Sequence, residues 1–106
     1  MKIYFTDKVK GKELGPNGRR NLDEALAIFR DLSQDGDSVL GIELADDVAV
    51  QFLYMHDGLW LVNIIDINND IAYNKEVTAL DCETYIRECF ATGKIPRHDG
   101  FEEEKL

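Results

Sequence analysis

Residues 48–66 read VAVQFLYMHDGLWLVNIID, and the Asp57-Gly58 pair inside this stretch decides the fold. Two runs of strand-forming side chains flank the pair, at residues 48–56 and 59–66. Asp-Gly is a preferred pair for a two-residue β-hairpin turn, because both residues tolerate the backbone geometry that matches the twist of the strands. The sequence therefore predicts an antiparallel hairpin centred on Asp57-Gly58.

Three further strands are predicted around this hairpin. A turn at Asp46-Asp47 connects the strand at residues 38–45 to the hairpin. A polar loop at residues 68–70 connects the hairpin to the strand at residues 71–77. The last strand carries Asn74 and Glu76, side chains that suit an exposed sheet edge. The predicted additional strands are residues 2–6, 38–45 and 71–77.

Two helices are also predicted. Asn21 and Glu24 form a capping-box pattern at the start of the first helix, whose apolar residues repeat at helical spacing until Gly36. Thr78 or Asp81 caps the second helix, which Gly93 closes. The expected fold is α+β, with an antiparallel sheet of about four to five strands packed against two helices. The apolar stripes are Leu22, Ala25, Leu26, Phe29 and Leu32 in the first helix, and Cys82, Tyr85, Ile86, Cys89 and Phe90 in the second.

The length of 106 residues suits a single domain, residues 1–106, whose charge is uneven. A basic N-terminal strand and loop, residues 1–20, carries six basic and two acidic side chains. The rest of the chain carries six basic and nineteen acidic side chains. It is expected to form an acidic α+β body, residues 21–97, and a mobile acidic tail, residues 98–106. This charge disfavours nucleic acid and anionic membrane as partners and favours a basic partner.

No run of 18 apolar residues occurs, and the first residues lack the pattern of a signal peptide, so a cytoplasmic protein is expected. Cys82 and Cys89 are separated by about 10 Å of helical rise, whereas a disulfide needs Cα atoms within about 7 Å. The two thiols are therefore expected to be free and buried in the core, as in a reducing compartment.

The predicted hairpin registers place Leu53 opposite Val62 and Ile42 opposite Gln51, and they sort the three central strands into two faces. One face is almost entirely apolar and is expected beneath the helices. The other face is mixed, with polar side chains among apolar ones. It is too apolar to be fully exposed to water, so a partner is expected to cover part of it. The apolar face holds Leu40, Ile42, Leu44, Ala49, Gln51, Leu53, Met55, Trp60, Val62 and Ile64. The mixed face holds Val39, Gly41, Glu43, Val50, Phe52, Tyr54, His56, Leu59, Leu61, Asn63 and Ile65.

The sequence offers few parts for catalysis. His56 and Asp57 are adjacent strand residues that point to opposite faces, so the carboxylate is not expected to orient the imidazole. Residues 66–70 look like the start of a calcium loop, but Ile71 and Val77 stand where that loop needs glycine and glutamate. No enzyme activity, cofactor or metal site is therefore expected.

The order of segments resembles the bacterial immunity proteins that neutralise polymorphic secreted toxins, in particular immunity protein family one. The resemblance covers roughly residues 21–104, and its most specific piece is Thr92-Gly93-Lys94-Ile95-Pro96 at the end of the second helix. The other matching segments are Leu22-Asp23-Glu24-Ala25-Leu26, Gly36-Asp37, Leu40-Gly41-Ile42-Glu43-Leu44 and Asp57-Gly58-Leu59-Trp60.

The resemblance implies a non-catalytic domain that binds a cognate toxin domain and so protects the producing cell. Many such toxins are nucleases or deaminases with basic substrate grooves, to which an acidic protein binds with fast, salt-sensitive association. We expect the contact face to include Glu43, Tyr54, His56 and Asn63. An acidic rim at the strand ends is expected from Asp46, Asp47, Asp57, Asp66 and Asp70.

Two other functions fit the sequence. A homodimeric or regulatory protein-binding scaffold would bury the mixed sheet face against a second copy, since an apolar face of this size is rarely left exposed on a monomer. An enzyme would need a carboxylate other than Asp57 close to His56 in a pocket.

Overall fold

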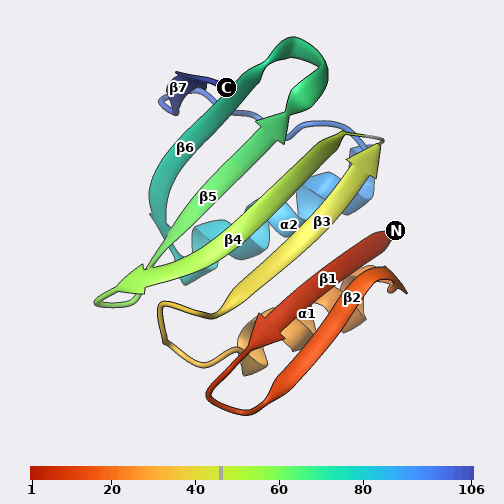
Figure 1. The fold of residues 1–106 in the computed structure, drawn as a ribbon, viewed down its shortest axis with the longest axis vertical. Helices are drawn as coiled ribbons and strands as arrows, with labels where there is room; N and C mark the ends of the chain where they lie inside the picture. Colours follow the sequence, from red (N-terminus) through yellow and green to blue (C-terminus); the bar gives the residue numbers. More distant parts are fainter. Residues whose placement is uncertain (46) are drawn as a thin grey trace.

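The computed structural model describes residues 1–45 and 47–106, including their side chains except those of residues 16 and 17. One antiparallel sheet forms a layer, and both helices pack behind it on the same face (Figure 1). The α+β class is confirmed, although the described residues form seven strands rather than four to five. Their order across the sheet is β2-β1-β3-β4-β5-β6-β7. The elements are β1 (Lys2–Asp7), β2 (Lys12–Arg19), α1 (Leu22–Asp31), β3 (Val39–Ala45), β4 (Val48–His56), β5 (Leu59–Asp66), a short 3-10 helix η1 (Ile67–Asn69), β6 (Ile71–Thr78), α2 (Ala79–Thr92) and β7 (Glu102–Lys105).

The two additional strands form the two edges of the sheet. β2 lies in the stretch expected to be a loop because of its glycines and proline, and it pairs with β1. β7 lies in the tail that was expected to be mobile, and it pairs with β6 from Ile71 to Asn74. β6 is therefore an inner strand and not the expected edge.

The predicted helix caps are confirmed. The side chain of Asn21 accepts a hydrogen bond from the Glu24 N–H, and Glu24 accepts one from the Asn21 N–H, which completes the capping box of α1. α1 ends at Asp31, several residues before Gly36. Thr78 caps α2, and Gly93 ends it with a left-handed φ of 66° and an N–H that donates to the Cys89 carbonyl.

The hairpin turn at Asp57-Gly58 is confirmed, with positive φ values of 51° and 76°. The expected register, however, holds only for the first pair, His56 with Leu59. A bulge at Met55 then shifts the ladder by one residue, so that Tyr54 lies opposite Trp60. A second bulge, at Leu44 in β3, shifts the β3–β4 ladder in the same way.

These two bulges reverse the two faces of β4. Because side chains alternate along a strand, a slip of one residue exchanges the buried and outward sets. Val50, Phe52 and Tyr54 point into the core, whereas Gln51 and Leu53 point away from it. The predicted faces of β4 are therefore wrong, while Leu40 and Ile42 of β3 and the buried residues of β5 lie on the core face as predicted.

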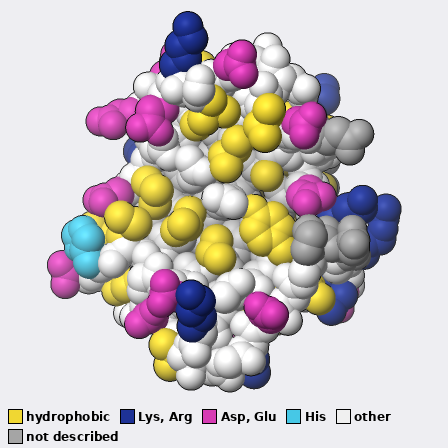
Figure 2. Space-filling view, in the orientation of Figure 1, with side chains coloured by type: hydrophobic (Ala, Val, Ile, Leu, Met, Phe, Trp, Pro, Cys, Tyr) yellow, Lys and Arg dark blue, Asp and Glu magenta, His cyan; other side chains and the backbone are white. Residues whose placement is uncertain are grey.

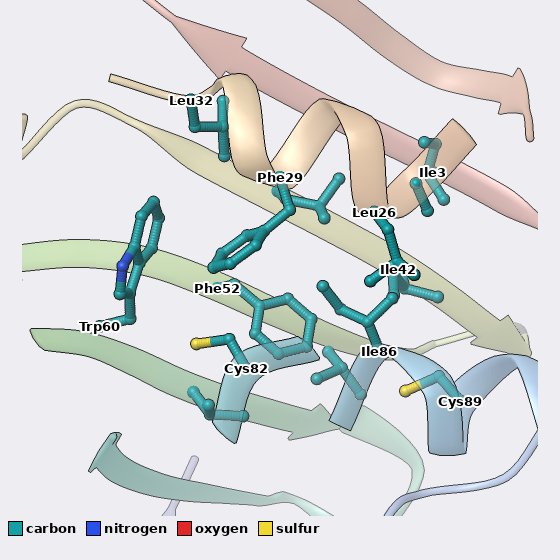
Figure 3. Packing of buried hydrophobic residues seen from close by; sticks show 14 of the residues in the cluster. Ile3, Leu26, Phe29, Leu32, Ile42, Phe52, Trp60, Cys82, Ile86 and Cys89 are labelled. Atoms are coloured by element: carbon teal, nitrogen blue, oxygen red, sulfur yellow. The ribbon is translucent and has the colours of Figure 1, made fainter. Parts of the chain in front are cut away.

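The core lies between the sheet and the two helices (Figure 3). Phe29 of α1 packs against Trp60 and Phe52, with ring centroids 4.7 and 6.2 Å away. α2 contributes Ile86 and two cysteines, both of which are free and buried as predicted. Within the described part of the chain, no helix has the length and apolar content needed to span a membrane.

Candidate functional site

The sheet face opposite the helices is the candidate site, and we call it the uncovered face. Most of its central side chains are half-buried, although Gly41 is buried and Glu76 is exposed, and they stand apart from the core cluster beneath the helices. Figure 2 shows this face, with hydrophobic side chains gathered at its middle and acidic side chains around them. From the strand registers, its central residues are Tyr4, Val39, Gly41, Glu43, Ala49, Gln51, Leu53, Leu61, Asn63, Ile65, Asn74 and Glu76.

The registers arrange these side chains in three rows that cross the sheet. The two outer rows are mainly apolar in the middle, and the inner row is polar. Each row ends in a glutamate near the β7 edge. The rows are Val39–Leu53–Leu61–Glu76, then Tyr4–Gly41–Gln51–Asn63–Asn74–Glu102, and then Lys2–Glu43–Ala49–Ile65–Ala72–Glu104.

Hydrogen bonds join the polar side chains into two separate groups, one on β1 and β4 and the other on β5, β6 and β7. The Gln51 amide donates to the Tyr4 hydroxyl, and the Asn63 amide donates to the Asn74 carbonyl oxygen. Asn74 in turn donates to Glu104, at 3.4 Å. Because these polar groups bond to one another, a partner can cover them at a smaller desolvation cost than isolated polar groups would impose.

Charge is distributed unequally between the two edges of the uncovered face. Glu76, Glu102 and Glu104 form what we call the acidic edge. At the other side, Lys2 of β1 pairs with Arg19 of β2, which we call the basic edge. The uneven charge of the sequence therefore becomes a charge gradient across one face.

Three predicted contact residues lie on or beside this face. Glu43 and Asn63 are half-buried members of the rows. His56 is exposed at the end of the hairpin, where its ring nitrogens lie 3.1 Å from an Asp57 oxygen and 3.9 Å from a Glu76 oxygen. The expectation that Asp57 does not orient the imidazole is therefore wrong, because Asp57 is a turn residue with a φ of 51° just after β4, so strand alternation does not separate the two side chains.

The fourth predicted contact residue, Tyr54, lies in the core instead. Its side chain is only 9% exposed and packs edge-to-face against Trp60. Its hydroxyl accepts a hydrogen bond from the Gly58 N–H at 3.0 Å, which supports the hairpin turn. The bulge at Met55 is the cause, because it turns Tyr54 toward the helices.

The predicted acidic rim does not form one cluster. Asp47 and Asp70 are exposed at one end of the strands, whereas Asp57 lies at the opposite end. Asp66 is only 7% exposed, and its carboxylate accepts hydrogen bonds from the backbone and side-chain nitrogens of Asn69. Asp66 therefore stabilises η1 and is not available to a partner, and Asp46 lies outside the described residues.

Sequence reasoning missed the glutamates of the acidic edge and Gln51. Glu102 and Glu104 were assigned to a mobile tail, and Gln51 was assigned to the face beneath the helices. No signal in the sequence marks Glu102 and Glu104, because Glu103 stands between them and the segment EEEK shows no alternation.

In the described residues, no group of three His, Cys, Asp or Glu side chains is placed to hold a metal ion. Burial raises the pKa of the Cys82 and Cys89 thiols to about 12, which makes them poor nucleophiles. A shallow depression of about 440 Å³ lies near the acidic edge, lined by Leu61, Asn74, Lys75, Glu76, Gly100 and Glu102.

Comparison of the chain with family models, with curated proteins and with solved structures found no match. The resemblance to the immunity proteins therefore stays a prediction. The function has to be argued from the geometry of the uncovered face.

Proposed function

We propose that the chain is an immunity protein that binds and neutralises a cognate toxin domain through the uncovered face. The observation that carries this proposal is the three rows of side chains, in which two rows with apolar middles flank a polar row and a glutamate ends each row at one edge. The apolar side chains supply a centre that loses water on contact, and the charged side chains supply a rim. That combination is typical of specific protein interfaces.

The apolar centre is the source of binding energy in this proposal. Leu53 and Leu61 lie directly opposite each other on β4 and β5, and Val39 extends their row onto β3. These side chains belong to no packed cluster beneath the helices, so they are available to a partner. Burial of apolar surface stabilises a complex by about 25 cal/mol for each Å² removed from water.

The acidic edge determines which partners bind. With a net charge of −9 and glutamates ending all three rows, the face attracts a basic surface such as the substrate groove of a nuclease or deaminase. Association with such a partner is expected to be fast and to slow as salt is added, because salt screens exposed charges.

The proposal is tested by co-expressing the chain with the C-terminal domain of the secreted protein encoded immediately upstream. We expect the domain to arrest growth alone and the chain to restore growth and co-purify with the domain. Leu61→Glu is expected to abolish both effects. Leu80→Glu is the matched control, because Leu80 is 76% exposed on α2, away from the uncovered face. A toxic domain that the wild-type chain neither binds nor neutralises would contradict the pairing.

A homodimer is the second candidate, and the charge gradient favours it specifically. If two copies pack face to face around a twofold axis parallel to the strands, the acidic edge of one copy lies over the basic edge of the other. Sedimentation of the wild-type chain at micromolar concentration separates the two candidates. A monomer excludes this alternative, whereas a dimer that Leu61→Glu dissociates would place the toxin site elsewhere.

A further inference from the structure

The second half of strand β6 lies at an open edge of the sheet. The ladder between β5 and β6 runs along the whole strand to Thr78, whereas the ladder between β6 and β7 ends at Asn74. Figure 1 shows β7 beside the first half of β6 only. Within the described chain, no strand pairs with residues 75–78 on this side, and we call this segment the open edge.

The backbone groups that the open edge offers follow from the alternation of an antiparallel ladder. The Leu106 N–H donates to the Asp70 carbonyl, so every second residue of β6 counted from Asp70 directs its backbone groups toward this side. Glu76 and Thr78 are the members of that series beyond Asn74. As the N-cap of α2, Thr78 uses its carbonyl for the first bond of the helix. Three groups remain for a partner: the N–H and C=O of Glu76 and the N–H of Thr78.

An acidic depression lies beside the open edge. Its volume is about 440 Å³, and Glu76 and Glu102 supply its carboxylates. Lys75 also lines it, but this side chain starts on the opposite face of β6, and its Nζ lies 5.8 Å from the centroid of the Phe101 ring. Leu61 adds an apolar wall on which the aliphatic stem of a lysine or arginine can pack. The depression therefore suits a long basic side chain.

We propose that the open edge binds an extended, basic segment of another protein by strand addition. The backbone of the segment pairs with Glu76 and Thr78, and a lysine or arginine side chain lies in the depression beside Glu76 and Glu102. Strand addition takes affinity from main-chain hydrogen bonds and specificity from the pockets that receive alternate side chains. Charge disfavours a second copy of this chain as the occupant, because pairing of two open edges would bring the Glu76 side chains of both copies close together.

The test is an NMR titration of the isotope-labelled full chain with the peptide Thr-Val-Lys-Val-Thr, acetylated and amidated at its ends. We expect the peptide to shift the amides of Glu76 and Thr78 and to slow their exchange with solvent, because both N–H groups gain acceptors. The amides of Lys75 and Val77 face β5 and should change less.

Two matched peptides separate the backbone contribution from the charge. A peptide with a methyl group on the backbone nitrogen of its lysine should bind at least fivefold more weakly, because it loses a donor to the edge and places the methyl group against it. A peptide with glutamate in place of lysine should not bind, because the depression is acidic. Equal binding of either peptide and the parent would overturn the proposal, as would Glu76 and Thr78 amides that do not respond at millimolar concentration.

A pair of neighbouring glutamates provides the matched variants of the chain. Glu102→Gln should weaken binding of the lysine peptide about two- to fivefold, as for one partly exposed ion pair. Glu103→Gln is the control and should leave the affinity unchanged, because Glu103 is exposed and its side chain points to the other face of β7. Thermal unfolding shows whether each variant retains the fold, and a folded Glu102→Gln variant that binds as the wild type does would contradict the proposal. No toxin is present in this experiment, so its outcome is independent of the proposed immunity function.

Discussion

The aromatic ring of Tyr4 lies across Gly41 on the uncovered face, so closely that a Cβ atom on Gly41 would come within 2.0 Å of the ring. Gly41 is buried although it lies on this face, because the ring covers it. The same placement lets the Tyr4 hydroxyl accept a hydrogen bond from Gln51, which lies two strands away on β4. Gly41 is therefore required for the polar row to form.

Gly41→Ala is expected to displace the Tyr4 ring and to lower the free energy of unfolding by about 1 to 3 kcal/mol, the usual cost of overpacking. Urea unfolding measures this change. In a Tyr4→Ala background the same substitution should cost much less, because no ring remains to be displaced. An equal cost in both backgrounds would contradict the contact.

The ion pair between Arg30 and Glu83 predicts a pH dependence of stability. Arg30 donates two hydrogen bonds to the Glu83 carboxylate, at 2.6 and 3.2 Å, and this contact between α1 and α2 holds the pKa of Glu83 below its ordinary value of 4.5. A group with a lowered pKa in the folded state stabilises the fold above its unfolded pKa. That contribution is lost as the pH falls through the lower, folded value.

The melting temperature of the wild-type chain should therefore fall more than that of Glu83→Gln between about pH 6 and pH 3, the range in which carboxyl groups titrate. Glu13→Gln, at an exposed position of β2, is the control and should follow the wild type. Identical pH profiles for wild type and Glu83→Gln would show that the pair does not stabilise the contact between the helices.

The two buried thiols predict slow chemical modification. Cys82 and Cys89 are both 0% exposed, and burial raises the pKa of each thiol to about 12, so neither access nor ionisation favours reaction. Labelling with a thiol reagent at neutral pH should therefore follow the rate of unfolding and accelerate in urea. Rapid labelling of the native protein would contradict this packing.

The pairing of β7 with β6 predicts local protection from hydrogen exchange. Deletion of residues 102–106 should leave the fold intact but expose the backbone of β6 as a new sheet edge. Amides of β6 should then exchange markedly faster, while those of β3 and β4 should change little. Unchanged exchange in β6 would mean that β7 does not pair in solution.

Local signals in the sequence predicted the hairpin turn, the helix caps and most strand boundaries. Asp57-Gly58, the Asn21 capping box and the Gly93 stop each act within a few residues, so they can be recognised without the rest of the fold. β2 and β7 have no comparable signal. The segment KELGPNGR contains one large apolar residue and EEEK none, so both become strands because a neighbouring edge offers backbone partners.

The candidate site was harder to predict because β4 is apolar on both faces. Val50 and Phe52 alternate with Ala49 and Leu53, so alternation alone does not decide which set is buried. The bulges at Leu44 and Met55 decide it, and no turn residue marks them in the sequence. Tyr54 was therefore placed on the contact face, and Gln51 and Leu53 were placed in the core.

The central claim is that the uncovered face binds a basic toxin domain, and the rate and affinity of that binding test it most directly. Surface plasmon resonance with the purified toxin domain would compare the wild type with Leu53→Glu and with the acidic-edge variant Glu76→Lys. Leu80→Glu serves as the control.

We predict that Leu53→Glu speeds dissociation and weakens affinity by about 2 kcal/mol or more, as expected at the centre of an interface. Glu76→Lys should mainly slow association and reduce its dependence on salt, as expected for a charge at the rim. If folded Leu53→Glu and Glu76→Lys variants bind the toxin domain as the wild type does, in both rate and salt dependence, the uncovered face is not the binding site.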